Sequence, residues 1–332
     1  MIDARLKRID LMIARGVPLA VALNEIGVRG QHYLWWRAAY GARSLGQVRE
    51  LMGRPRSVQP AETYEGRALP GLCSVCGQAA GFAAFSDNVR ESGQCRACGS
   101  TNRQRQMAYM LRMTLDQGQA GPLKPTRPLA LHNTESTGPI HDRLKDWPGY
   151  TFSEYWGPEH QPGEVVRGIR HEDLQALSFA DASLDLMLSS DVLEHMPRPY
   201  DAHADIFRAL KPGGRHIFTV PFAPRMADDV RARLVGDDIE YLADKVYHGD
   251  PIRPDEGVLV WTVFGLEMLD RLRAIGFRPS LWFLSKPELG IVGDAIVFEA
   301  YKPAWPGLPT SRILEAVALG TARSAPLTPA SP

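Results

Sequence analysis

The chain has 332 residues, 44% of them hydrophobic and 23% charged, and its 38 basic side chains balance 38 acidic ones. This is the composition of a globular protein with room for more than one domain, and a net charge of zero gives no global sign of a nucleic-acid partner. The N-terminal segment lacks the apolar core of a signal peptide, and no run of about 18 apolar residues suggests a membrane span. We therefore expect a cytoplasmic protein with no membrane partner.

Residues 1–56 are predicted to form a module of short helices. Gly16-Val17-Pro18 separates a first amphipathic helix from a second that ends near Ile26. After a turn at Gly27, a third helix is expected over about 29–40, which gives a helix-turn-helix outline. The segment has ten Lys or Arg and four Asp or Glu, a local excess of positive charge. Residues 57–70 have no periodicity and are expected to be a linker.

All the cysteines of the chain lie in the pairs "CSVCG" and "CRACG", within a segment predicted to span 71–106. This spacing is typical of a four-cysteine zinc ribbon, in which four thiolates close a tetrahedral, structural site. Gly77 and Gly99 allow the tight turn that follows each pair. A redox dithiol and four unrelated thiols remain alternatives. Arg103 and Arg105 after the second pair would contact phosphates or lie in solvent. The expected zinc ligands are Cys73, Cys76, Cys95 and Cys98.

Strand-like and helix-like segments alternate from about 127 to 303, as in a parallel sheet with crossover helices. We expect this domain to span 107–305 and the tail, 306–332, to be disordered. An insertion at 222–260 is too long for an ordinary connection and is expected to be functional. The individual predictions are strands at 184–190, 215–220, 280–285 and 295–302, helices at 199–210 and 261–277, and a turn at 211–214.

Residues 172–222 contain "DLQALSFADASLD", "LEH" and "LKPGG" in that order. This run resembles the class I S-adenosylmethionine-dependent methyltransferases, close to their small-molecule branch. The resemblance implies an α/β fold with a doubly wound, seven-stranded Rossmann-like sheet. It further implies S-adenosylmethionine as cofactor and a small-molecule or glycan-type acceptor. It names neither the acceptor atom nor the oligomeric state.

The first loop of such a domain usually has three glycines, whereas "LHNTESTGP" keeps only Gly138. It is similar to a less common branch whose motif reads "LH-x-x-P-E-x-G" and which often follows a cysteine ribbon. That likeness implies an altered cofactor loop, with loss of cofactor binding as the alternative. Ligands of open α/β sheets bind outside the carboxyl ends of the strands. The cofactor residues implied are Glu135 and Gly138 in the loop, Glu154 for the ribose, Asp173 with Leu174 for the adenine, and Asp191.

The resemblance places Asp191, Glu194 and His195 after the fourth strand, facing the methyl group. His195 is a candidate general base, and Asp191 a second catalytic candidate. Alternatively "LEH" braces the following loop, since methyl transfer can proceed by orientation alone. In the insertion, Tyr247, His248 and Asp250 are expected to cover the cleft as a lid, which makes His248 a third candidate.

Residues 22–41, "ALNEIGVRGQHYLWWRAAYG", resemble the helix-turn-helix of insertion-sequence transposase small subunits. The resemblance implies DNA contact through Arg29, Gln31 and His32, whereas a docking module is the alternative. Two interpretations of the whole chain follow. It is an enzyme with accessory modules, or a DNA-binding protein whose methyltransferase fold senses a ligand or acts on nucleic acid.

Overall fold

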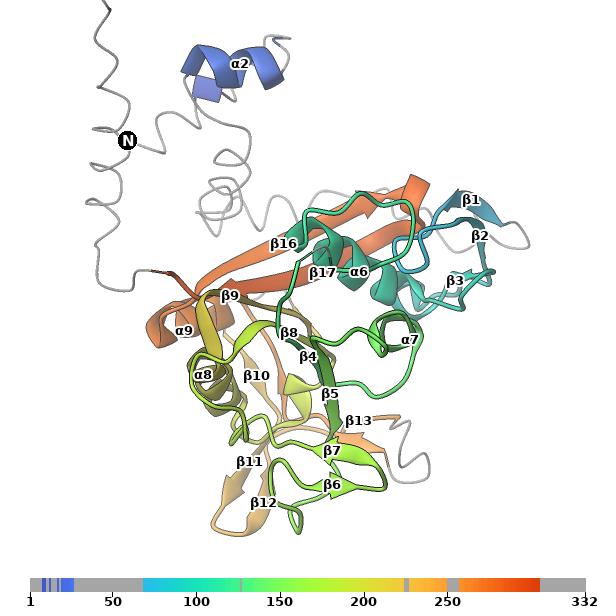
Figure 1. Ribbon diagram of the computed structural model, residues 1–332. Coiled ribbons are helices and arrows are strands. Elements are labelled where there is room, and N and C mark those ends of the chain that lie inside the picture. The colour runs from blue at the N-terminus through green and yellow to red at the C-terminus, as the bar shows by residue number, and fades with distance from the viewer. Residues whose placement is uncertain are drawn as a thin grey trace, which may run out of the picture.

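The computed structural model describes residues 68–125, 127–223, 227–249 and 257–304 (Figure 1), together with positions 8–9, 12, 17 and 19–26 near the N-terminus. Helix α2 (Leu19–Ile26) ends at the residue expected for the second helix of the N-terminal module. The rest of that module, most of the linker, Asp250 and the tail from 305 onward lie outside the described residues. None of the described helices is both long and apolar enough to cross a bilayer.

A mixed sheet organises the molecule, with strand order β16-β17-β9-β8-β4-β5-β7-β6. Strands β4, β5, β7, β8 and β9 run parallel, and β17, β16 and β6 are antiparallel additions. The chain crosses from β7 back past β5 and β4 to β8, which makes the sheet doubly wound. The strands are β4 (Leu131–Asn133), β5 (Tyr150–Glu154), β6 (Val165–Val166), β7 (Ile169–His171), β8 (Leu184–Ser190), β9 (Leu210–Thr219), β16 (Arg278–Lys286) and β17 (Ile291–Tyr301).

The sheet has eight strands rather than the seven expected, because the chain after β5 forms a short hairpin. In that hairpin β6 pairs antiparallel with β7 and adds a two-residue strand at the edge. Two other expectations also change. The helix expected over 261–277 is shorter, because Thr262–Val263 forms strand β15 and helix α9 (Glu267–Ile275) begins only afterwards. The "KPGG" turn at 211–214 lies within β9, where the pairing with β8 shifts register.

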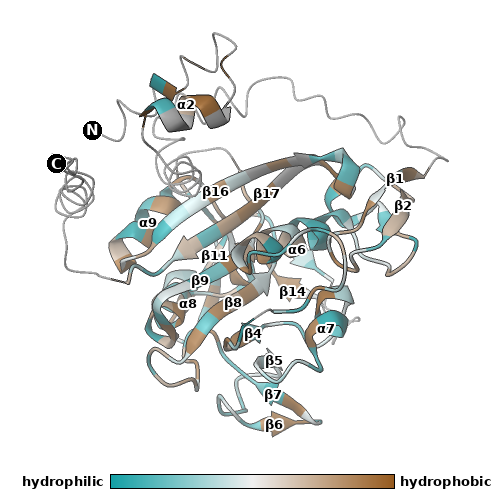
Figure 2. Ribbon diagram, turned by 45° about the horizontal axis from the view of Figure 1, so that its top comes forward, coloured by the Kyte–Doolittle hydropathy of each residue, from teal (hydrophilic) through white to brown (hydrophobic). Residues whose placement is uncertain are grey.

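Helices cover both faces of the sheet, because alternate side chains of each strand point to opposite sides. Leu186 and Leu188 of β8 pack with α6 (Asn102–Thr114) and α7 (Pro139–Leu144). Met187 between them packs with α8 (Pro199–Ala209) and α9 on the other face. Figure 2 shows the apolar colouring along β8 between these helix layers. Proline at the first position of α7 and α8 has a fixed φ suited to a helix start.

The cysteine segment lies against the same face as α6 and shares its hydrophobic core. It forms a small antiparallel sheet of β1 (Leu69–Leu72), β2 (Ala79–Ala83) and β3 (Gln94–Cys95). The 3₁₀ turn η1 (Val89–Glu91) lies between β2 and β3. Thr101 and Gln104 form a reciprocal capping box that starts α6 directly after the second cysteine pair. Helix α6 therefore connects the cysteines to the large sheet.

The insertion after β9 is built of short hairpin strands. These are β10 (Asp229–Val230), β11 (Ala232–Val235), β12 (Asp238–Tyr241), β13 (Tyr247–His248) and β14 (Val258–Leu259). Strand β10 pairs with β15, β11 with β12, and β13 with β14. The segment expected as a loop over the cleft thus has its own hydrogen-bonded framework, anchored to the main domain through β15.

Arg112 joins the first cysteine turn to the chain that follows α6. Its side chain is 1% exposed and donates hydrogen bonds to the carbonyls of Ser74 (2.6 Å), Gly118 (2.8 Å) and Gly121 (2.8 Å). We predict that Arg112→Met lowers the free energy of unfolding by roughly 2–4 kcal/mol, because three carbonyls lose a charged donor. Denaturant unfolding measures this change. The exposed Arg143→Met is the control, and an equal, small effect of both substitutions would contradict the prediction.

Candidate functional site

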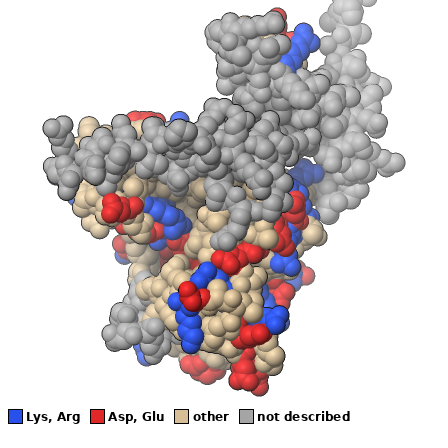
Figure 3. All heavy atoms as spheres, turned by 180° about the vertical axis from the view of Figure 1, so that it is seen from behind, with Lys and Arg blue, Asp and Glu red and all other residues tan. Residues whose placement is uncertain are grey.

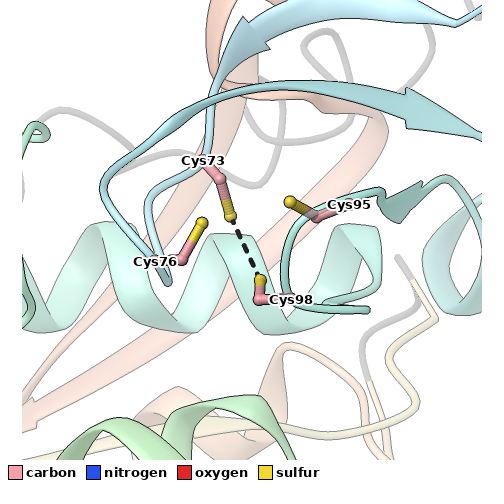
Figure 4. A group of neighbouring side chains, drawn as sticks. All are labelled: Cys73, Cys76, Cys95 and Cys98. Carbon is pink, nitrogen blue, oxygen red and sulfur yellow. Dashed lines mark hydrogen bonds between the residues drawn. The ribbon is translucent and has the colours of Figure 1, made fainter.

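The four cysteines converge on one point between the two turns and α6 (Figure 4). Their sulfur atoms all lie within 4.8 Å of one another, and Cys73 Sγ and Cys98 Sγ are 3.7 Å apart. Two thiolates on a tetrahedral zinc ion are about 3.8 Å apart, since Zn–S bonds are about 2.3 Å long. No disulfide links them. The expected ligands are therefore together, at a separation that fits a four-thiolate metal site.

Both cysteine turns have the local geometry that their glycines were expected to allow. Gly77 N donates to Cys73 O at 2.7 Å, and Gly99 N donates to Cys95 O at 2.8 Å. The two glycines have φ of +69° and +73°. A Cβ at Gly77 would lie 1.6 Å from the carbonyl oxygen of Gly121, so this turn needs a glycine for space as well as for conformation.

Neither arginine after the second cysteine pair lies in solvent, contrary to one sequence expectation. Arg105 is fully buried and donates to the carbonyls of Ser100 and Gly290, and its guanidinium stacks 4.3 Å from the centre of the Phe82 ring. Burial lowers the pKa of Arg105 to about 10. The side chain of Arg105 is therefore structural and out of reach of phosphates, whereas Arg103 lines the cavity described next.

A cavity of about 1450 Å3 opens at the carboxyl ends of the parallel strands. The sequence marked eight residues for cofactor binding or catalysis, and the structure brings all eight to this cavity. They are Glu135, Gly138, Glu154, Asp173, Leu174, Asp191, His195 and His248. They come from four strand ends and the insertion, whereas Asp250 and the residues expected to contact DNA lie outside the described residues. Their individual roles remain predictions.

The loop between β4 and α7 is held by side chains where relatives use glycines. Asn133 Nδ2 donates to Glu135 O at 3.1 Å and to Tyr150 Oη at 3.0 Å. Ser136 donates from both its backbone N (2.8 Å) and its Oγ (2.6 Å) to Glu154 Oε1. Gly138 then has φ of +92° before Pro139 starts α7. The loop therefore needs a single glycine, at its last residue.

The two acidic residues expected to hold nucleoside groups lie at neighbouring strand ends. Glu154 ends β5, and Asp173 follows β7, the next strand of the sheet. Asp173 Oδ1 accepts from Gln175 N at 2.9 Å, which fixes the carboxylate against its own turn. Leu174 is 3% exposed but contributes to the cavity wall. Two carboxylates beside an apolar surface match hydroxyl and amino groups around a flat ring.

Asp191 is the centre of an ion-pair network that the sequence did not predict. Its carboxylate pairs with Arg90 of η1 and lies 3.6 Å from Nε of Arg103, and Thr219 Oγ1 donates to it at 3.0 Å. Burial alone would raise the pKa of Asp191, but the guanidiniums outweigh it and lower that pKa below its usual range. Asp191 also has φ of +54°, a conformation rare outside glycine. An ionised carboxylate held in this way is a poor proton acceptor.

Arg103 belongs to α6, and its positively charged side chain lines the cavity. Its Nε donates to Glu91 Oε1 at 2.6 Å, and its guanidinium also bonds Ser190 Oγ at the end of β8. Burial opposes the charge, but Asp191 and Glu91 together raise the pKa of Arg103 above its usual value. The cysteine segment and α6 therefore form one wall of the cavity. Long-range packing creates this wall, so local sequence patterns held no signal for it.

His195 and His248 both line the cavity, with their ring centres 4.9 Å apart. His195 belongs to the 3₁₀ turn η2 (Leu193–His195) after β8, and His248 to β13 of the insertion. Glu194 lies beside both rings, and its carboxylate Oε1 is 3.6 Å from a nitrogen of each. The sequence resemblance placed Glu194 with Asp191 and His195 after the fourth strand, but gave it no role of its own.

A doubly wound sheet with strand-end carboxylates facing one cavity is the arrangement in which α/β proteins hold ligands outside the carboxyl ends of their strands. Residues 154–218, from the end of β5 to β9, match the family model described as a methyltransferase domain. This part of the chain is therefore similar to a methyltransferase domain, and it lies within the doubly wound sheet.

Two curated relatives are similar over part of that domain, and both are described as uncharacterized methyltransferases. The protein from Mycobacterium marinum is 43% identical over 72 residues, which are 20% of this chain and 27% of the relative. The protein from Mycobacterium avium is 47% identical over 75 residues, covering 20% and 29%. The chain thus spans less than a third of the length of these relatives.

Solved structures with a likeness to the chain include two methyltransferases. One is the 1,6-didemethyltoxoflavin-N1-methyltransferase of Burkholderia thailandensis with its substrate and S-adenosylhomocysteine bound, at 18% identity, 61% of this chain, 78% of that chain and a TM-score of 0.35. The other is an S-adenosylmethionine-dependent methyltransferase of Mesorhizobium loti, at 18% identity, 59% and 98% coverage and a TM-score of 0.35.

Glu135 has an unusual charge environment that predicts a pH effect on stability. Burial, opposed by Arg103 and reinforced by Glu154 and Asp191, raises the pKa of Glu135 from 4.5 to about 7. The fold therefore favours the protonated form, a contribution that is complete below the unfolded-state pKa and is lost as the pH rises toward 7. Between about pH 5 and 8, the free energy of unfolding of the wild type should fall relative to Glu135→Gln by on the order of 1–2 kcal/mol.

Denaturant unfolding of both proteins at a series of pH values measures this difference. The comparison with Glu135→Gln isolates one carboxyl, because all other titrating groups are common to the two proteins. Parallel stability curves across this range would show that Glu135 titrates as an ordinary exposed carboxyl.

Proposed function

We propose that the chain is an S-adenosylmethionine-dependent methyltransferase that acts on a small-molecule or glycan-type acceptor. One observation carries the proposal: Glu154 and Asp173, at adjacent strand ends, face one cavity beside a loop that ends in Gly138. The cofactor would supply a methyl group on a positively charged sulfur, and the acceptor atom would form a bond to that carbon as the carbon–sulfur bond breaks. The matched methyltransferase domain over 154–218 supports the same activity.

The residues of the cavity suit the parts of this cofactor. Glu154 would accept from the ribose hydroxyls, Asp173 from the adenine amino group, and Leu174 would lie against the ring. The acidic side chain of Glu135, next to the single-glycine loop, would attract the ammonium group of the methionine part. Asp191 would position this part through Arg90 and Arg103 rather than remove a proton, since its pKa is lowered.

The size of the cavity supports a small acceptor bound beside the cofactor. Sites for one small ligand are about 300–1000 Å3, so about 1450 Å3 leaves room for a second molecule. On the face shown in Figure 3, the described residues carry acidic and basic side chains near one another. His195 and His248, which both line the cavity, would face the acceptor. Contact of residues 22–41 with DNA stays a separate hypothesis, which rests on the sequence resemblance and local charge.

Titration calorimetry with S-adenosylmethionine tests the cofactor assignment. The wild type should show saturable binding, and Asp173→Ala should weaken it about ten- to hundredfold, because one charge-assisted hydrogen bond contributes about 1.5–3 kcal/mol. The exposed Asp146→Ala is the matched control and should bind as the wild type does. No binding to the wild type at millimolar cofactor would overturn the enzyme assignment.

We also propose that the cysteine cluster binds a structural zinc ion. The support is the mutual distance of the four sulfur atoms and the two glycine turns around them. Four thiolates leave no open coordination position, so the ion would hold the segment together without taking part in the reaction.

Thiol titration tests the zinc assignment. In the zinc-loaded protein the four thiols should react slowly, and a chelator should release zinc and make all four reactive. The same treatment should lower the midpoint of thermal unfolding, because the bound metal contributes to folding. Four thiols that react at the same rate with and without chelator would show that no metal binds there.

A further inference from the structure

Glu194, His195 and His248 form a second cluster of metal-type side chains, separate from the cysteines. One ligand atom of each lies within 4.8 Å of the other two. Two belong to η2 after β8, and the third to β13 in the insertion. The set of two imidazoles and one carboxylate is a common ligand set of zinc and of other first-row transition metals.

The carboxylate of Glu194 points to a missing ligand. Its side chain is 0% exposed, and neither of its carboxylate oxygens has a hydrogen-bond partner among the described residues. A buried ionisable group without a partner is costly, and native structures satisfy such groups by hydrogen bonds, by water or by ions. His195 Nε2 and His248 Nδ1 are each 3.6 Å from Oε1, which is ion-pair distance for a protonated ring but longer than a hydrogen bond.

The same distances suit ligands that share one ion. Nitrogen and oxygen ligands lie about 2.1 Å from a tetrahedral zinc ion and therefore about 3.4 Å from each other. The observed separations of 3.6 Å from Glu194 Oε1 to the two ring nitrogens are close to this value. The three groups are thus arranged around a common point rather than bonded to one another.

His195 already has the tautomer that a metal ligand needs. Its Nδ1 lies 2.9 Å from the carbonyl oxygen of Leu259, and because a carbonyl only accepts, Nδ1 must carry the hydrogen. In the neutral ring Nε2, the nitrogen that faces Glu194, then has a free lone pair. A backbone carbonyl that orients a histidine in this way is a regular outer partner of metal-bound imidazoles.

The insertion provides the remaining parts of the cluster on one hairpin. His248 of β13 pairs with Val258, and Tyr247 pairs with Leu259, whose carbonyl orients His195. On the other side, Trp261 N donates to Glu194 O at 2.8 Å and fixes η2 against the start of β15. The hairpin therefore positions both imidazoles relative to the buried carboxylate.

We propose that Glu194, His195 and His248 bind a divalent first-row transition-metal ion where the two histidines line the cavity. Three protein ligands leave coordination positions open, and both histidines line the cavity. An acceptor with an oxygen or nitrogen donor would complete the coordination, so hydroxyl-bearing acceptors of the chelating type are the substrate class. This last step rests on the proposed methyltransferase function, whereas metal binding itself does not.

Zinc counting on the full chain tests the proposal. Wild type, Glu194→Gln, His248→Ala and His160→Ala are each equilibrated with excess zinc, gel-filtered and measured for zinc per chain by mass spectrometry. Glu194→Gln and His248→Ala should each hold one zinc ion fewer than the wild type. His160→Ala should hold the wild-type number, although His160 Nδ1 also lies near a carboxylate, at 3.2 Å from Glu164 Oε1.

The cysteine cluster does not confuse this count. Cys98→Ser should lose a different zinc ion, which remains in Glu194→Gln, and circular dichroism confirms that each variant is folded. Zinc content is measured without catalytic activity, so an inactive protein gives the same result. Cofactor calorimetry on the same samples tests the proposed function separately. Equal zinc content in the wild type, Glu194→Gln and His248→Ala would overturn the metal site and leave a cluster of unbonded acid and imidazoles.

Discussion

The ion pairs between Asp191 and the arginines of the cysteine segment determine how the site is built. Asp191 stands at the end of β8 with φ of +54°, and Arg90 and Arg103 reach it from η1 and α6. These contacts join the cysteine segment to the end of β8, in addition to the apolar packing and the hydrogen bonds of Asn102 and Arg105 to the last strands. These side chains are only 15–30% exposed, so removing either partner leaves a partly buried charge without its counter-ion. The cysteine segment thereby forms part of the functional site as well as of the core.

The loop after β4 shows how a glycine-rich function can be met by other side chains. Relatives use three glycines so that the backbone can approach the cofactor closely. Here Asn133 holds the carbonyl of Glu135, and Ser136 donates twice to Glu154. Glu154 therefore has two roles, because it accepts hydrogen bonds from the loop and also lines the cavity. A substitution at Glu154 would therefore affect loop geometry and ligand contact together, which explains why a change at Asp173 is easier to interpret.

The sequence predicted what depends on local periodicity and spacing. Strand β8 has the bounds expected, Leu184–Ser190, because its apolar run ends at polar residues on both sides. The cysteine spacing predicted a cluster, and the order of motifs predicted which strand ends would meet. It could not show that Arg103 reaches the cavity while Arg105 is buried against Phe82, because two residues on one helix differ only in what packs around them. Nor could it show that 261–277 divides into β15 and α9, since that division follows from pairing with β10.

The packing of the cysteine segment against the last two strands has a consequence for how the chain folds during synthesis. Asn102 donates to the carbonyl of Val292, 190 residues later, and Arg105 donates to Gly290, 185 residues later. At about 5–20 residues per second, a ribosome needs roughly 10–40 s to cover that distance. During this interval Asn102 and Arg105 at the start of α6 lack the carbonyl groups of Val292 and Gly290 to which they donate in the folded protein. The cysteines therefore emerge long before their core is complete, so the proposed zinc ion would bind before final packing and would hold the nascent segment until the C-terminal hairpin arrives.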